Sequence, residues 1–199
     1  MDAGEFMQQV EVLELVEVEP DNYLWQPVKT LWAKMEHQTA RAIFTINSVM
    51  QRSIKFTIWA LPELTLHHAL LFPDGNTHYY LADINKDTPG IYVLTALIVV
   101  PITCIAERTK TIKGDHNRPN TVNLPPVVFP GVLTEKYIRQ TQEEPMSYTE
   151  ARYILVTPKV ITLRVGELVY IIGKPYEIVV FHGLDPYRNE YEILGRSDN

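Results

Sequence analysis

The feature that most limits the fold of this chain is an internal repeat of strand-forming segments. When the sequence is compared with itself at an offset of 97 residues (Thr162 against Thr65), a match runs without a gap over residues 56–81. The match favours two similar β-units in tandem. Two unrelated strand meanders that share a period are the alternative. The aligned positions are mostly apolar: Phe56 with Tyr153, Ile58 with Leu155, Leu64 with Ile161, Leu66 with Leu163, Leu71 with Leu168, Tyr79 with Tyr176 and Leu81 with Ile178.

Short segments of alternating apolar and polar residues, separated by turn residues, occur along most of the chain. Residues 10–18 alternate valine or leucine with glutamate, which is typical of an edge strand with one buried face. Strong turn signals such as Pro73-Asp74-Gly75-Asn76 separate the segments. One segment differs, because residues 39–48 (TARAIFTINS) space their apolar side chains by three and four. The pattern predicts a small β-barrel or sandwich with one short helix.

Residues 107–131 interrupt the strand pattern. A locally basic stretch leads there into the proline-rich segment LPPVVFP at 124–130, a composition typical of a linker or an extended arm. We therefore expect a mainly β protein with two similar barrel or sandwich units and a long connecting arm. The predicted boundaries are 1–106 for the first unit, 107–131 for the arm and 132–199 for the second unit.

Composition excludes several classes of protein. The chain has 199 residues, of which 46% are hydrophobic, so it can bury a sizeable core. Its 18 Lys and Arg against 24 Asp and Glu give a net charge of −6, which argues against a free nucleic-acid binder. Cys104 is the single cysteine, which excludes an intrachain disulfide and a thiolate metal cluster.

Two segments are candidates for a targeting or membrane signal. Residues 1–9 have neither a basic start nor an apolar run, so the sequence predicts no signal peptide. Residues 91–106 are too short to span a membrane as a helix, and Pro101 interrupts them. We therefore expect no membrane partner.

The sequence offers few candidate catalytic or metal-binding groups. His67, Asp74 and His78 are the alternative to a non-enzymatic function, since they can converge across a hairpin as in a metal hydrolase. Cys104 lies in an apolar run, where a thiol stays protonated and inert. Acidic residues at Glu143-Glu144 and at Asp185, Glu190 and Glu192 are interpreted as turn and strand-face residues. We expect no catalytic residue, no cofactor and no metal.

An ordered series of motifs resembles the head-tail joining and adaptor family of tailed bacteriophages. The first half has, in order, VEVLELVEVE, Trp25, LWAKME at 31–36, TARAIFTINS, SIKFTI and DGNTHYYL at 74–81. The second half repeats the hairpin motifs as GELV at 166–169, GKPYEIV at 173–179 and NEYEI at 189–193. The resemblance covers most of 10–97 and 150–196, and the arm lies outside it.

The resemblance implies a structural protein of the virion neck, made in the host cytoplasm. Such proteins form a ring beneath the portal, join the filled capsid to the tail, and in some cases close the channel to retain DNA. The expected partners are other copies in a ring of six or twelve, a portal or adaptor protein, and a tail or tail-completion protein. Packaged DNA is expected to pass through the lumen without sequence-specific binding. A tail-completion, terminator or baseplate β-domain that docks another virion protein is the alternative.

Two sets of residues are candidate contacts under this interpretation. The tryptophans Trp25 and Trp59 are assigned to the core or to subunit contacts, and Trp32 to the core. The basic arm is expected to pair with acidic surfaces of the portal or tail rather than with DNA. Its candidate contact residues are Arg108, Lys110, Lys113, His116, Arg118, Pro125, Pro126 and Phe129.

Overall fold

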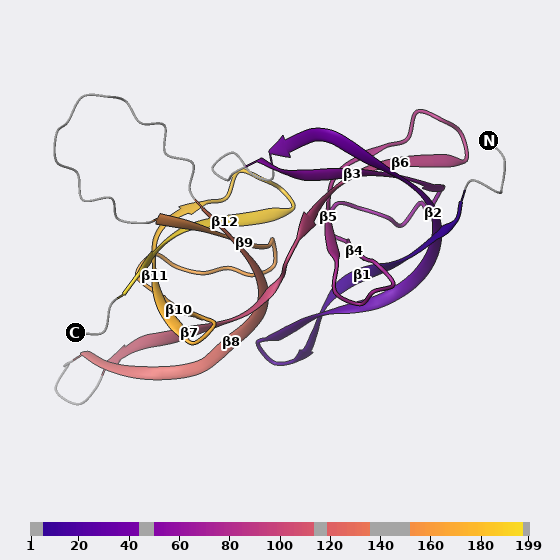
Figure 1. Ribbon diagram of the computed structural model, residues 1–199. Coiled ribbons are helices and arrows are strands. Elements are labelled where there is room, and N and C mark those ends of the chain that lie inside the picture. Colours follow the sequence, from indigo (N-terminus) through magenta and orange to yellow (C-terminus); the bar gives the residue numbers. More distant parts are fainter. Residues whose placement is uncertain (1–5, 44–49, 114–118, 136–151, 197–199) are drawn as a thin grey trace, which may run out of the picture. The chain divides into compact units, whose positions relative to one another are not determined.

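The computed structural model describes residues 6–43, 50–113, 119–135 and 152–196, and these residues form β-strands and turns (Figure 1). The prediction of a mainly β fold is confirmed. The described part contains no helix long and apolar enough to cross a membrane. The strands are β1 (Gln8–Glu19), β2 (Asn22–Ile43), β3 (Met50–Trp59), β4 (Ala69–Leu71), β5 (His78–Asn85), β6 (Ile91–Val99), β7 (Ile102–Lys113), β8 (Pro119–Glu135), β9 (Arg152–Pro158), β10 (Leu168–Ile171), β11 (Lys174–His182) and β12 (Arg188–Gly195).

The chain forms two compact units with the same strand topology. Unit 1 comprises Met1–Val16 and Trp25–Pro101, and unit 2 comprises Glu17–Leu24 and Ile102–Asn199. The first six strands pair in the order β1-β4-β5-β6-β3-β2, and a β1–β2 pairing closes the ring. The last six pair in the order β7-β10-β11-β12-β9-β8, and β7 pairs with β8. Each set is therefore a closed six-stranded barrel.

Residues 10–18 were expected to form an edge strand, and this prediction is wrong. Strand β1 pairs with β4 through Glu11 to Leu13 and also pairs with β2. Alternation of apolar and acidic residues shows that one face is buried, but it does not show how many neighbours a strand has.

The residue pairs of the β-ladders show which residues of the two repeats are equivalent. Leu81 pairs with Ala96, and Ile178 pairs with Ile193, which keeps the offset of 97 residues in both strands. The β-bulge that follows Leu81 recurs after Ile178. We name β1–β6 the first repeat and β7–β12 the second repeat.

In strands β3 and β9 the two repeats do not follow the offset of 97 residues. They differ from it by two residues. Trp59 pairs with Ile91, whereas Pro158 pairs with Arg188, so β3 and β9 correspond at an offset of 99. Phe56 therefore corresponds to Leu155, not to Tyr153 as the sequence comparison predicted. The connection from β10 to β11 is shorter than the one from β4 to β5, and this restores the offset of 97.

The short helix predicted for residues 39–48 is wrong where the structure describes it. Residues 39–43 belong to β2, and Arg41, Ala42 and Ile43 pair with β3. Residues 44–48 lie outside the described residues. Pairing with a neighbouring strand outweighs a weak helical spacing in a segment that contains β-branched residues.

The predicted connecting arm is a pair of regular strands. Residues 107–113 lie in β7 and residues 119–131 in β8, and together these strands form the first hairpin of the second repeat. The repeats therefore meet near Pro101 rather than at residues 106 and 131. Pro125 and Pro126 fall at an irregularity of the ladder, between the pairs Ala106–Val127 and Arg108–Leu124. Their missing N–H groups are tolerated at such a position, so a proline-rich composition does not exclude a strand here.

Apolar side chains fill both barrels. In unit 1 the rings of Phe56 and Tyr79 meet edge to face, with centroids 5.1 Å apart. In unit 2 the hydroxyl of Tyr191 donates a hydrogen bond to the Ile161 carbonyl and accepts one from the Leu163 N–H, each at 3.1 Å. Tyr191 is fully buried, so this side chain fastens the segment after β9 to the core.

Cys104 lies in the core of unit 2 beside Gly131. The side chain is fully buried, and burial raises the pKa of the thiol to about 12. The prediction of a buried, protonated thiol is confirmed. A Cβ added at Gly131 would lie 2.9 Å from the Cys104 sulfur and 2.8 Å from Leu155 Cδ1. Only glycine fits at this position without movement of its neighbours.

Candidate functional site

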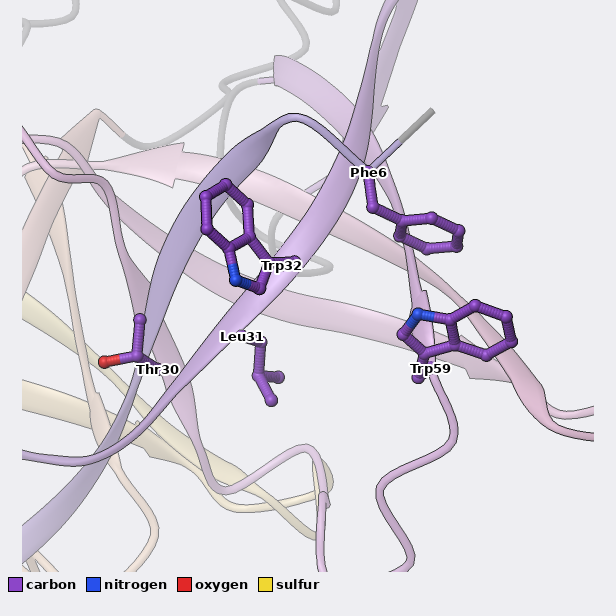
Figure 2. Close-up of a pocket in the computed structure, with 5 residues that line it drawn as sticks. All are labelled: Phe6, Thr30, Leu31, Trp32 and Trp59. Carbon is purple, nitrogen blue, oxygen red and sulfur yellow. The ribbon is translucent and has the colours of Figure 1, made fainter. Parts of the chain in front are cut away.

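Unit 1 carries an aromatic pocket with a volume of about 510 Å³, lined by Phe6, Thr30, Leu31, Trp32 and Trp59 (Figure 2). The rings of Phe6 and Trp59 stack with centroids 5.1 Å apart and an angle of 19° between their planes. Trp32 is 52% exposed and Trp59 is 53% exposed. Two large aromatic side chains held in solvent by strands are typical of a surface that binds another protein.

Strand alternation explains why these tryptophans face solvent. Ile54, Phe56 and Ile58 point into the barrel from β3, so the next residue, Trp59, points outward. Ala33 is fully buried in β2, and its neighbour Trp32 therefore lies on the opposite face. The assignment of Trp32 to the core was wrong. Phe6 and Trp32 were not predicted as contact residues, because the inward direction of Ala33, which decides the exposure of Trp32, is known only from the structure.

Trp25 packs within unit 1. Its ring lies against Tyr80, with centroids 5.8 Å apart, and the side chain is partly buried. The Trp25 Nε1 atom is buried and has no hydrogen-bond partner among the described residues. The packing fits the core assignment for Trp25, whereas the exposure of Trp59 fits a contact role, which stays a prediction.

The β7–β8 hairpin is the second exposed surface. Strand β10 pairs with β7 only as far as Glu107, and β9 pairs with β8 only from Val132 onward, so in the described part residues 108–113 and 119–124 pair only with each other. Directly opposite residues share a face of a two-stranded ladder. One face is apolar and basic, with Arg108, Lys110, Ile112, Val122 and Leu124, and the other carries Thr109, Thr121 and Asn123.

Only part of the predicted arm is available for contacts. Lys110, Pro125 and Pro126 are exposed, whereas Phe129 is fully buried in unit 2, so the contact role predicted for Phe129 is wrong. Alternation along β8 turns Phe129 inward. Of the other candidates, Arg108 is partly buried, the side chain of Lys113 is not described, and His116 and Arg118 lie outside the described residues.

Unit 2 includes the turn of the first hairpin, and its contacts explain the position of Arg108. Pro20 is followed by Asp21 at a φ of 61°, the order of a type II turn. The Asp21 carbonyl accepts a hydrogen bond of 2.8 Å from the Val128 N–H, and Asn22 pairs with Val128. The Asp21 carboxylate lies 3.1 Å from Arg108 Nη1. An acidic turn therefore rests against β8 beside a basic side chain.

Of the alternative hydrolase residues, Asp74 is a turn residue, His67 lies before β4, and His78 begins β5. The Asp74 carboxylate accepts hydrogen bonds from the N–H groups of Asn76 and Thr77, both at 2.9 Å, and from the Thr77 hydroxyl at 2.6 Å. These bonds lower the pKa of Asp74. Among the described residues, no three His, Cys, Asp or Glu side chains are placed to hold a metal ion. Asp74 shapes the β4–β5 turn.

The remaining acidic candidates divide between a turn and a buried strand. Asp185 accepts hydrogen bonds from the N–H groups of Tyr187 and Arg188, as expected of a turn residue. Glu190 and Glu192 are buried on β12, and Glu192 Oε1 lies 3.0 Å from His182 Nε2. Both glutamates lie on a strand, as the sequence predicted, and their side chains are buried. Glu143 and Glu144 lie outside the described residues.

No family model, curated protein or solved structure matches this chain. The resemblance to neck proteins of tailed phages therefore stays a prediction. The two exposed surfaces, the aromatic pocket and the β7–β8 hairpin, are the observations from which a function is proposed.

Proposed function

We propose that this protein is a structural component of the phage virion neck, a non-enzymatic head-tail connector of the adaptor or stopper type. It forms a ring between portal and tail and helps to retain DNA. The observation that supports this proposal is the tandem of closed barrels with two unlike exposed surfaces, the aromatic pocket in unit 1 and the apolar, basic hairpin in unit 2. A ring of identical subunits needs two different faces on each subunit, and this chain has them.

The duplication supports a role where two symmetries meet. Six copies of a two-barrel chain present twelve barrels of one topology, which suits a junction between a twelvefold and a sixfold ring. The net charge of −6 suits a lumen through which DNA slides, because an acidic wall repels phosphates instead of holding them. The proposed partners are the portal or adaptor protein on one side and a tail or tail-completion protein on the other.

The mass of the purified chain in solution tests the proposal. Light scattering coupled to size exclusion is run on the chain alone and on mixtures with the portal and tail proteins of the same phage. A ring of six or twelve chains, formed alone or on the portal, is the expected result. A chain that stays monomeric and ignores the portal contradicts the proposal. Binding to a tail or baseplate protein alone would favour the domain that docks another virion protein.

A further inference from the structure

The turn between β1 and β2 contacts strand β8 of the second repeat. The equivalent surface of the first repeat, on strand β2, has no such turn against it among the described residues. In unit 2 the Asp21–Asn22 segment lies against Val128 of β8, and Asp21 pairs with Arg108 of β7. The second repeat also begins with a hairpin, β7–β8, and the first repeat also has the receiving strand, β2. The equivalent contact therefore has a donor and a receiver in every copy of the chain.

The ladders identify the receiving residue in the first repeat. Met35 pairs with Phe56, and Leu133 pairs with Leu155, which occupies the position of Phe56 in the second repeat. Thr30 lies five residues before Met35, and Val128 lies five residues before Leu133, so Thr30 occupies the position of Val128. Thr30 lines the aromatic pocket of unit 1.

Exposure differs between the two receiving surfaces. Trp59 corresponds to Pro158, because these residues pair with Ile91 and Arg188 respectively. By the count used for Thr30, Trp32 corresponds to Pro130. Both prolines are buried, whereas both tryptophans are more than half exposed. The surface around Thr30 is thus the uncovered version of a surface that is covered in the second repeat.

The receiving position carries opposite charges in the two repeats. Val12 pairs with Leu70, and Ala106 pairs with Val169 at the equivalent place, so Arg108 corresponds to Glu14. In unit 2 the acidic Asp21 meets Arg108, whereas Glu14 at the equivalent place is acidic and exposed. A basic side chain on the docking hairpin, such as the exposed Lys110, would therefore find an acidic partner there.

We propose that the β7–β8 hairpin of one copy docks on strand β2 of the next copy at Thr30, beside Trp32 and Trp59. The apolar side chains of the hairpin cover the aromatic pocket, and Lys110 lies toward Glu14. This contact joins two different surfaces, so it propagates head to tail and closes into a ring when the rotation between copies allows. The inference deepens the proposed function and rests on it, because it names the contact that builds the ring.

Disulfide trapping between two variants, each with one added cysteine, tests the contact. Asn22 pairs with Val128 in unit 2, Thr30 is at the position of Val128, and Asn120 is exposed near the end of the hairpin that would dock there. Thr30→Cys and Asn120→Cys are purified separately, mixed under conditions where the chain assembles, and oxidised. The native Cys104 is buried and does not interfere. We expect covalent dimers in the mixture and none from either variant alone.

The controls separate failure of this contact from failure of the proposed function. Asn76→Cys places a thiol on the exposed β4–β5 turn and should not cross-link to Asn120→Cys. Dimers formed equally by each variant alone indicate a symmetric contact and overturn the inference. If the mass shows a ring but the Thr30 and Asn120 thiols do not cross-link, the contact is wrong and the ring function remains. If the chain stays monomeric with the portal present, both are wrong.

Discussion

Removing the hydroxyl of Tyr191 tests whether the buried hydrogen bonds fasten the second barrel. In Tyr191→Phe the ring remains and both hydrogen bonds of the hydroxyl are lost. The Ile161 carbonyl keeps a partner, because Asn189 Nδ2 also donates to it at 2.9 Å, whereas the Leu163 N–H loses the hydroxyl as acceptor. A lost bond costs about 1 kcal/mol, and a buried N–H left without an acceptor adds about 1–3 kcal/mol. We expect the free energy of unfolding to fall by about 2–4 kcal/mol.

Urea denaturation followed by circular dichroism measures this change. Trp25, Trp32 and Trp59 all lie in unit 1, so tryptophan fluorescence does not report directly on the barrel that contains Tyr191. Tyr92→Phe, which removes the hydroxyl of a half-buried tyrosine in unit 1, is the matched control and should change stability by less than about 0.5 kcal/mol. A loss of less than about 0.5 kcal/mol in Tyr191→Phe would refute the reasoning.

Three further measurements test other parts of the structure. Gly131→Ala should lower the free energy of unfolding by about 1–3 kcal/mol because the new methyl group overlaps its neighbours, and an unchanged urea midpoint would contradict the close packing. The raised pKa of Cys104 contributes stability that is present below pH 9 and is lost as the pH rises toward 12, at up to about 1.4 kcal/mol per pH unit. Cys104→Ala should therefore flatten the stability profile between pH 9 and pH 10, and an equal slope in both proteins would count against the burial. The double variant Trp32→Ser and Trp59→Ser should weaken self-association at least tenfold in light scattering, while its circular dichroism spectrum stays unchanged. If this variant still assembles fully, the aromatic pocket is not part of the interface.

Tertiary pairing corrected the expectations that rested on composition or local spacing. The proline-rich stretch looked like a linker because composition does not show that Pro125 and Pro126 fall at a break in a ladder. The segment 39–43 had helical spacing, yet its backbone pairs with β3. Phe129 was placed in an exposed arm, and alternation along β8 buries it. In each case the deciding partner lies on another strand, out of reach of a local pattern.

The sequence predicted only part of the candidate site. Trp59 and the basic hairpin could be named because exposed aromatic and basic residues are the usual contact groups. Trp32 could not be separated from a core residue, since its exposure depends on the inward direction of Ala33. The correspondence of Thr30 with Val128 required both ladders and could not be read from the sequence offset.

The sequence by itself determined the mainly β class and favoured two similar units. Period-two alternation buries one face of each strand, and a 97-residue offset carries the same hairpin motifs twice. The tertiary structure alone decided where each repeat begins, which strand neighbours which, and which aromatic side chains face solvent. Alternation specifies a strand and its two faces, but the hydrogen-bonded partners that close a barrel lie far along the chain and are chosen by the packing of the whole core.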